Sequence, residues 1–331
     1  FFFFLLFKGG GWCRNEENCA QRALTPLGSS TTYGPTFTVN YEGGDGLLGT
    51  TPDVNPDFYN WNLAYARYCD GASFAGYRAA PLQVGNQTIH FRGHSIFTNM
   101  MRDLMGKGMA KASEAVLAGC SAGGLAAYVH CDAFAQQIGA GVKTRCIADA
   151  GYFPDFVSTS GQRVVRDFYF YVYSMQNVSA GINQACVRAQ ANMGNASFCF
   201  FPQYMLPFLK TPVFALNSGY DSWQTEADWF SGAPDWTKCA LNLDACNATQ
   251  MQIVQQYHAN YISVLAPVLQ PASPHGAFIN SCHVHCQSAT WSTGTTIHNL
   301  TRQQAVSQWY HGHAAKLVDC PYPCHQPGSS C

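Results

Sequence analysis

Short apolar runs bounded by turn-forming residues recur along the first two thirds of the chain. Each run has the length of a β-strand, and continuous apolar runs of this length are typical of strands buried on both faces of a sheet. The runs predict strands over Phe1–Phe7, Leu63–Tyr68, Thr88–Phe91, Ala115–Ala118, Arg145–Ala148 and Pro212–Leu216.

Helical patterns lie between several of these runs. Ser95–Met105 places Ile96, Met100, Met101 and Leu104 on one face of a helix, and the Ala-rich stretch Gly124–Gln137 ends before Gly139. Strands that alternate with helices indicate a mostly parallel sheet with right-handed crossovers. The sequence therefore predicts an α/β fold, with a central sheet flanked by helices.

We expect one domain over residues 1–331, because α/β sheets with insertions reach this size without dividing. Residues 151–208 are rich in aromatic side chains and lack clear periodicity, so we interpret them as an insertion that covers the sheet. Residues 320–331 are rich in Pro, Gly and Cys and predict a tied-down tail.

The charge balance argues against two classes of partner. Only 11% of the residues are charged and the formal net charge is -1, which gives no electrostatic reason for binding nucleic acid or an anionic membrane.

The apolar run at residues 1–7 is much shorter than the ~20 residues of a membrane span. It is better interpreted as a buried strand that leads into Gly9–Gly11. We therefore expect the sequence to begin inside a fold, with N-terminal strands missing.

Fifteen cysteines indicate an oxidising compartment, where thiols form disulfides. Several occur in pairs at short spacing: Cys13 and Cys19, Cys239 and Cys246, Cys282 and Cys286, Cys320 and Cys324. Zinc is the alternative for Cys282–Cys286 (CHVHC), but a comparable second pair is far away in sequence. Five Asn-x-Ser/Thr acceptors, at Asn86, Asn177, Asn195, Asn247 and Asn299, also favour a secreted, glycosylated protein.

The pentapeptide Gly119–Gly123 (GCSAG) matches the Gly-x-Ser-x-Gly pattern of a nucleophile elbow. An apolar strand precedes it and an Ala-rich helix follows, which is the context that the motif requires. Ser121 would then lie near a helix N-terminus, where partial positive charge favours a developing anion. The alternative is an ordinary βα loop with a solvent-facing serine. We take Ser121 as the candidate nucleophile.

A serine hydroxyl needs a base, and the base needs an acid that fixes its tautomer. In this class of fold the order along the chain is Ser, acid, His. Asp221 follows the predicted strand at Pro212–Leu216 and is favoured weakly over Asp149, Asp228, Asp235 and Asp244. Spacing alone does not separate His283 from His285 as the base. Gly9–Gly11 (GGG) follows the first strand and is interpreted as an oxyanion-binding loop rather than a flexible turn.

Longer motifs resemble those of the pectin acetylesterase and Notum family of carboxylesterases, in the family's order and closest to the plant-type members. They are GGGWC (Gly9–Cys13), NPDFYNWN (Asn55–Asn62), RYCDGASF (Arg67–Phe74), the long stretch Lys107–Asp132 around the elbow, DAGYF (Asp149–Phe153), YDSWQ (Tyr220–Gln224) and CHVHCQS (Cys282–Ser288).

The resemblance implies an α/β-hydrolase-like, secreted, disulfide-containing enzyme without a cofactor or metal. By position it implies Ser121 as nucleophile, Asp221 as acid and His285 as base, with oxyanion donors at the backbone N–H groups of Gly10, Gly11 and Ala122. His283 and Lys8 depart from the family pattern. From the resemblance we also expect the family's first strands, with a cysteine there that would pair with Cys69, to be missing from this sequence. Cys120 is another candidate for a free thiol.

These inferences predict a monomeric, extracellular serine esterase, in the cell wall, that removes acetyl groups from pectin-like polysaccharide. Removal of a fatty acyl group from a protein, as in Notum, is the alternative within the same enzyme class. A non-catalytic carbohydrate-binding relative is the alternative from another class, which a complete Ser–His–Asp set argues against.

Overall fold

A computed structural model describes residues 1–35, 46–230 and 234–324 of the chain. Seven parallel strands form one sheet in the order β2-β1-β5-β6-β7-β8-β9. The strands are β1 (Phe2–Phe7), β2 (Asn62–Ala66), β5 (Glu114–Cys120), β6 (Lys143–Asp149), β7 (Val213–Ser218), β8 (Gly276–Asn280) and β9 (Lys316–Val318). The predicted α/β-hydrolase-like fold, with a parallel sheet and several disulfides, is confirmed.

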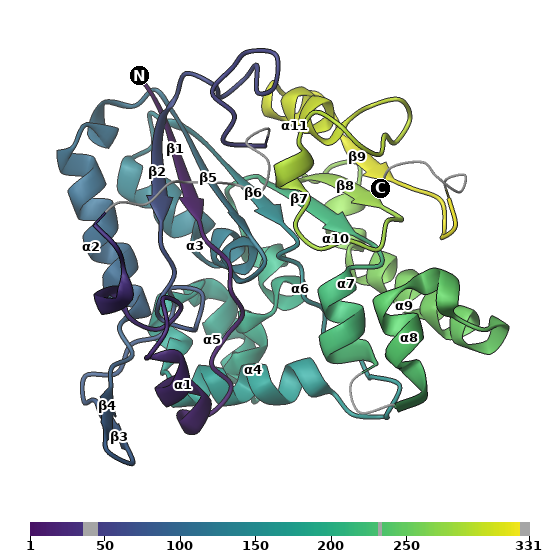
Figure 1. Cartoon of the computed structure of the whole chain (residues 1–331). Helices are drawn as coiled ribbons and strands as arrows, with labels where there is room; N and C mark the ends of the chain where they lie inside the picture. Colours follow the sequence, from purple (N-terminus) through teal and green to yellow (C-terminus); the bar gives the residue numbers. More distant parts are fainter. Residues whose placement is uncertain (36–45, 231–233, 325–331) are drawn as a thin grey trace.

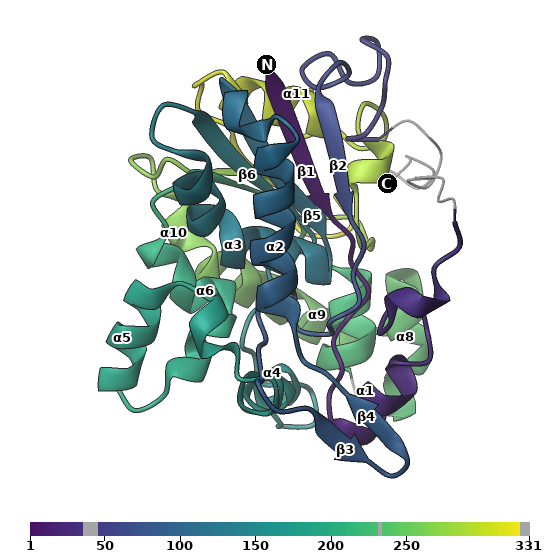
Figure 2. The ribbon, with the colours of Figure 1, turned by 90° about the vertical axis from the view of Figure 1, so that its left-hand side faces the viewer.

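Helices cover both faces of this sheet (Figures 1 and 2). On one face, α2 (Gly93–Gly106) and α3 (Ala122–Ile138) share a core with alternate residues of β1, among them Leu5 and Phe7. On the other face, α11 (Arg302–Tyr310) packs with the intervening Phe4 and Leu6. Each fully buried aromatic or leucine side chain contributes about 1.5–3 kcal/mol, which explains why β1 is apolar at every position.

The remaining helices are shorter or lie beyond the carboxyl ends of the strands, which point toward α1 and α4 in Figure 1. They are α1 (Glu16–Arg22), α4 (Val164–Met175), α5 (Gln184–Asn192), α6 (Pro202–Met205), α7 (Ser222–Gln224), α8 (Thr237–Leu241), α9 (Ala248–Val264) and α10 (Ala266–Leu269). Three of them, α4, α5 and α6, lie within residues 151–208. The interpretation of this segment as an insertion in a single domain stays a prediction.

Two predicted strands differ from the observed ones. The run at Thr88–Phe91 contributes only β4 (Gln87–Ile89), which pairs antiparallel with β3 (Leu82–Val84) in a hairpin outside the main sheet. Gly85, with φ 54°, forms the turn that joins them. The run at Leu63–Tyr68 forms β2 as predicted, but β2 is an edge strand on which Leu63 is 45% exposed.

Three of the four closely spaced cysteine pairs form disulfides, Cys13–Cys19, Cys239–Cys246 and Cys320–Cys324, whereas Cys282 and Cys286 are not bonded to each other. Cys131–Cys146 and Cys186–Cys199 are also bonded. Cys69 is free, as expected, and is the free cysteine among the described residues. Of the predicted tail, residues 325–331 lie outside the described part of the chain. None of the described helices combines the length and the hydrophobicity required to cross a bilayer.

A buried histidine in α3 makes the stability of the fold sensitive to acid. His130 is 1% exposed, stacks on Phe97 at 4.1 Å and contacts the Ser73 carbonyl oxygen at 3.0 Å. Burial lowers the pKa of His130 to about 3. The unfolded chain therefore binds a proton near pH 6.5 that the folded chain excludes, so stability is lost as pH falls from about 6.5 toward 3.

We expect a His130→Gln variant to lose less stability than the wild type over this range. The difference should be on the order of 4 kcal/mol when urea unfolding is compared between pH 7 and pH 3 to 4. His90→Gln, at an exposed position, is the control and should keep the wild-type pH dependence. If the unfolding free energies of His130→Gln and the wild type fell equally with pH, His130 would not be the source of the acid sensitivity.

Candidate active site

Ser121 occupies a strained turn between β5 and α3. Its φ and ψ of 59° and -127° lie in a region that residues other than glycine rarely adopt. Two glycines permit the turn: a Cβ on Gly119 would lie 2.1 Å from the Gly123 carbonyl oxygen, and one on Gly123 would lie 2.3 Å from the Phe7 carbonyl oxygen. The Ser121 hydroxyl makes no capping hydrogen bond to α3, so its oxygen is available for chemistry.

Asp221 and His285 are in direct contact. Asp221 follows β7, is fully buried, and accepts hydrogen bonds from the Gln224 backbone N–H at 3.0 Å and from His285 Nδ1 at 2.8 and 2.9 Å. Phe153 and Trp223 flank the imidazole, with ring centroids 6.5 and 6.1 Å away. A buried carboxylate on Nδ1 fixes the tautomer in which Nε2 can accept a proton.

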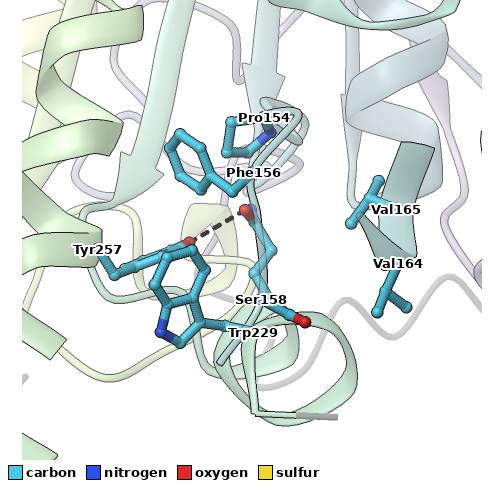
Figure 3. A pocket seen from close by; sticks show the side chains of 8 residues that line it. Pro154, Phe156, Ser158, Val164, Val165, Trp229 and Tyr257 are labelled. Carbon is cyan, nitrogen blue, oxygen red and sulfur yellow. Dashed lines mark hydrogen bonds between the residues drawn. The ribbon is translucent and has the colours of Figure 1, made fainter. Parts of the chain in front are cut away.

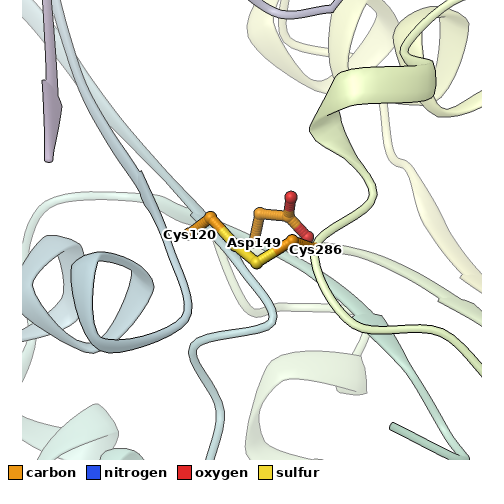
Figure 4. A group of neighbouring side chains, drawn as sticks. All are labelled: Cys120, Asp149 and Cys286. Carbon is orange, nitrogen blue, oxygen red and sulfur yellow. A yellow bond between two sulfur atoms is a disulfide. The ribbon is translucent and has the colours of Figure 1, made fainter. Parts of the chain in front are cut away.

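A disulfide joins the elbow to the histidine loop. Cys120, the last residue of β5, is bonded to Cys286, so the residue before Ser121 is linked to the residue after His285 (Figure 4). The structure thus brings all three candidate residues to the carboxyl edge of the sheet. The prediction of Cys120 as a free thiol is wrong, because a bridge spanning 166 residues leaves no trace in local spacing.

Among the competing aspartates, the structure gives Asp149 a different role. The buried Asp149 carboxylate, beside this disulfide in Figure 4, accepts the backbone N–H groups of Gln287 at 2.8 Å and Ser288 at 2.7 Å. Burial raises the pKa of Asp149, and these hydrogen bonds oppose that rise. Asp235 and Asp244 are exposed, and the side chain of Asp228 lies outside the described residues. Asp149 therefore holds the backbone of the histidine loop just after His285.

His283 has a different hydrogen-bond partner from His285. Its Nε2 lies 3.0 Å from the Thr225 hydroxyl, and burial lowers its pKa. Cys286 is bonded to Cys120, and Cys282 is also disulfide-bonded, so neither cysteine of the CHVHC segment offers a thiolate to a metal.

The triple-glycine loop lies against the elbow. A Cβ on Gly9 would be 2.9 Å from Ser121 Cβ, which places the loop beside the candidate nucleophile. The backbone N–H groups of Gly10, Gly11 and Ala122 donate to no acceptor in the part of the chain that the structure describes. Unsatisfied N–H groups next to a nucleophile are what an oxyanion requires. The N–H of Trp12 is likewise unused there, a candidate that the glycine pattern alone does not indicate.

Comparison with known proteins places the chain in one family over nearly its whole length. The family model described as Pectinacetylesterase matches residues 2–329. Pectin acetylesterase 5 of Arabidopsis thaliana is 38% identical over 328 residues, which cover 96% of this chain and 74% of that protein. Pectin acetylesterase 4 of the same plant is 38% identical over 333 residues, covering 97% and 78%. The chain belongs to the pectinacetylesterase family.

A more distant relative of this pectinacetylesterase family member has a name that gives a different substrate from that of the pectin acetylesterases. Palmitoleoyl-protein carboxylesterase NOTUM of Mus musculus is 31% identical over 242 residues, which cover 68% of this chain and 45% of that protein. The resemblance expected from the motifs is confirmed. Family membership makes the protein a carboxylic ester hydrolase of the serine hydrolase class.

A small cavity lies behind the acid loop of this pectinacetylesterase family member (Figure 3). Its volume is about 20 Å³, enough for roughly one water molecule. The Tyr257 hydroxyl donates to Gln224 Oε1 at 3.1 Å beside it, and the Gln224 N–H contacts Asp221. The cavity therefore belongs to the packing that supports Asp221 and is too small to hold an acyl chain. Its other labelled walls are Pro154, Phe156, Ser158, Val164, Val165 and Trp229.

Removing the Cys120–Cys286 disulfide should impair both stability and activity. We expect the Cys120→Ser/Cys286→Ser variant to lose about 2–5 kcal/mol of unfolding free energy, and its kcat should fall because the histidine loop loses its tether to the elbow. Urea unfolding and p-nitrophenyl acetate hydrolysis measure the two effects. Cys239→Ser/Cys246→Ser, which opens a local bridge elsewhere, should reduce stability while leaving kcat intact. If the two variants had equal kcat values, the Cys120–Cys286 disulfide would have no specific role in holding the histidine loop for catalysis.

Proposed function

We propose that this protein is a secreted serine carboxylesterase that hydrolyses acetyl esters of pectin-like polysaccharide, with Ser121, His285 and Asp221 as its catalytic triad. The observation that carries the proposal is the buried Asp221–His285 hydrogen bond, on a loop that a disulfide links to the residue before Ser121. That arrangement supports a base with a fixed tautomer beside an activated hydroxyl.

The proposed reaction is acyl transfer in two steps. His285 Nε2 takes the Ser121 proton while the Ser121 oxygen attacks the ester carbonyl carbon. The N–H groups of Gly10, Gly11 and Ala122 stabilise the oxyanion, and the imidazolium returns the proton to the leaving sugar hydroxyl. Water, deprotonated by His285, then attacks the acetyl-enzyme and releases acetate. Asp221 stabilises the imidazolium in both steps.

Two observations support the substrate and the location. The relatives named pectin acetylesterases align with 96–97% of the chain, whereas the palmitoleoyl-protein carboxylesterase aligns with 68%. Six disulfides among the described residues support an oxidising, extracellular environment.

The decisive assay compares three substrates under the same conditions: acetylated pectin, p-nitrophenyl acetate and p-nitrophenyl palmitate. We expect acetate release from pectin and hydrolysis of the acetyl ester, with the palmitoyl ester cleaved far more slowly. Preference for the palmitoyl ester would replace the proposal with fatty-acyl removal. Binding of pectin without release of acetate would indicate a non-catalytic relative.

A further inference from the structure

Two side chains donate hydrogen bonds to carbonyl groups of the triple-glycine loop. Arg22 Nη1 donates to the Gly10 carbonyl oxygen at 2.8 Å, and the Tyr68 hydroxyl donates to the Gly11 carbonyl oxygen at 2.8 Å. In a trans peptide the C=O and the following N–H point in opposite directions. Fixing these two oxygens therefore aims the N–H groups of Gly11 and Trp12 away from Arg22 and Tyr68.

Arg22 is itself fixed in place. It is the last residue of α1, its Nε donates to the Leu27 carbonyl oxygen at 2.7 Å, and its guanidinium carbon lies 5.2 Å from the centroid of the Tyr68 ring. A cation on the Gly10 carbonyl oxygen withdraws electron density from the Gly10–Gly11 peptide. The Gly11 N–H becomes a stronger donor as a result, because hydrogen bonds in a chain polarise one another.

Tyr68 links the glycine loop to the first turn of α3. Its fully buried hydroxyl accepts the Ser73 backbone N–H at 3.0 Å. The Ser73 hydroxyl donates to the Ala122 carbonyl oxygen at 2.8 Å and accepts the Trp12 indole N–H at 2.9 Å. One continuous network thus connects the two backbone segments that carry the candidate oxyanion donors.

The turn that contains Ser73 is built to hold this network. Ser73 and Phe74 have φ of 52° and 60°, which is costly for residues other than glycine. The buried Asp70 carboxylate stabilises the turn by accepting the backbone N–H groups of Ala72 and Phe74, both at 3.0 Å. This gives the RYCDGASF motif (Arg67–Phe74) a role that the triad leaves unassigned.

We propose that Arg22 and Tyr68 are positioning residues that orient and polarise the oxyanion-binding peptides. The proposal rests on the serine esterase function proposed above. Neither side chain touches the substrate; each acts through a backbone amide. Their contribution belongs to the transition state, where negative charge develops on the carbonyl oxygen, so it affects kcat rather than KM.

The principal test is an Arg22→Ala variant assayed with p-nitrophenyl acetate. We expect kcat to fall by about 10- to 100-fold with KM nearly unchanged, somewhat less than the loss of a direct oxyanion donor. Arg22 lines a cavity of about 460 Å³, so added methylguanidinium can enter and should restore part of the lost kcat. Arg102→Ala, at an exposed arginine of α2, is the matched control and should behave as the wild type in both assays.

A second variant, Tyr68→Phe, removes one oxygen atom and keeps the buried ring. We expect it to lower kcat, and we expect both variants to weaken binding of a trifluoromethyl ketone, whose adduct carries an oxyanion, by the same factor as kcat/KM. A merely structural loss would lower the melting temperature without this proportionality or the methylguanidinium rescue. Should Arg22→Ala fail to fold, Tyr68→Phe and Arg22→Lys decide the question.

The outcomes separate this inference from the proposed function. If Ser121→Ala is inactive while Arg22→Ala and Tyr68→Phe keep the wild-type kcat and inhibitor affinity, the positioning role is wrong and the esterase assignment stands. If Ser121→Ala retains activity, the serine mechanism itself fails, and the Arg22 and Tyr68 results no longer bear on an oxyanion.

Discussion

A Ser121→Ala variant should hydrolyse p-nitrophenyl acetate with a kcat about 10⁴- to 10⁶-fold below that of the wild type. The substitution removes the attacking oxygen and leaves the elbow backbone, the Asp221–His285 pair and the glycine loop in place. Residual rate above that of water comes from substrate binding and the oxyanion donors alone. Ester hydrolysis followed at 405 nm and acetate release from pectin should fall together.

Ser113, at the other end of β5 from Ser121, provides the matched control. Ser113 precedes β5, is exposed, and donates its hydroxyl to the Phe1 carbonyl oxygen. Ser113→Ala should keep the wild-type kcat, and neither substitution should reduce the melting temperature greatly. A Ser121→Ala variant with more than about one hundredth of the wild-type kcat would assign the nucleophile to another group.

The central strands were predictable because burial on both faces leaves a continuous apolar run. β1, β5 and β7 follow this rule over most of their length, and β6 follows it only at Cys146–Ala148. The order of these strands and the helices implies the parallel sheet. β8 (Gly276–Asn280) was missed although every residue in it is buried, because it is short and begins with glycine after a Pro- and Ser-rich turn. The three residues of β9 are half-buried and carry no distinct pattern.

Some residues of the candidate site were likewise predictable from contiguous sequence, whereas others could be found only from contacts between distant segments. Gly119–Gly123 identified the elbow because the motif and its strand–helix context are contiguous in sequence. Spacing alone could not decide whether Asp221 or Asp149 is the acid, because each comes at the end of a predicted strand. Only the tertiary contacts show that Asp221 binds His285, whereas Asp149 accepts the Gln287 N–H. The roles that we assign to Arg22 and Tyr68 depend on contacts with glycine carbonyls, which no residue pattern reports.

An Asp221→Asn variant should lose about 10⁴-fold in kcat while remaining folded. The carboxylate accepts the proton on His285 Nδ1, whereas an amide can present its NH₂ group and favour the tautomer protonated at Nε2. That tautomer cannot accept the Ser121 proton. Loss of the negative charge also destabilises the imidazolium, so the acid limb of the pH–rate profile should move to lower pH in this variant.

Asp149→Asn is the control, because this aspartate is as buried as Asp221, is the last residue of the neighbouring strand β6 and competes with Asp221 in the sequence. Its amide oxygen can still accept the Gln287 or Ser288 N–H, so kcat should fall far less and the acid limb should stay in place. Comparing the full pH–rate profiles of the two variants distinguishes a charge that stabilises the imidazolium from an acceptor that shapes the loop. If Asp149→Asn were the more damaging substitution and moved the acid limb, the acid of the triad would have to be reassigned to Asp149.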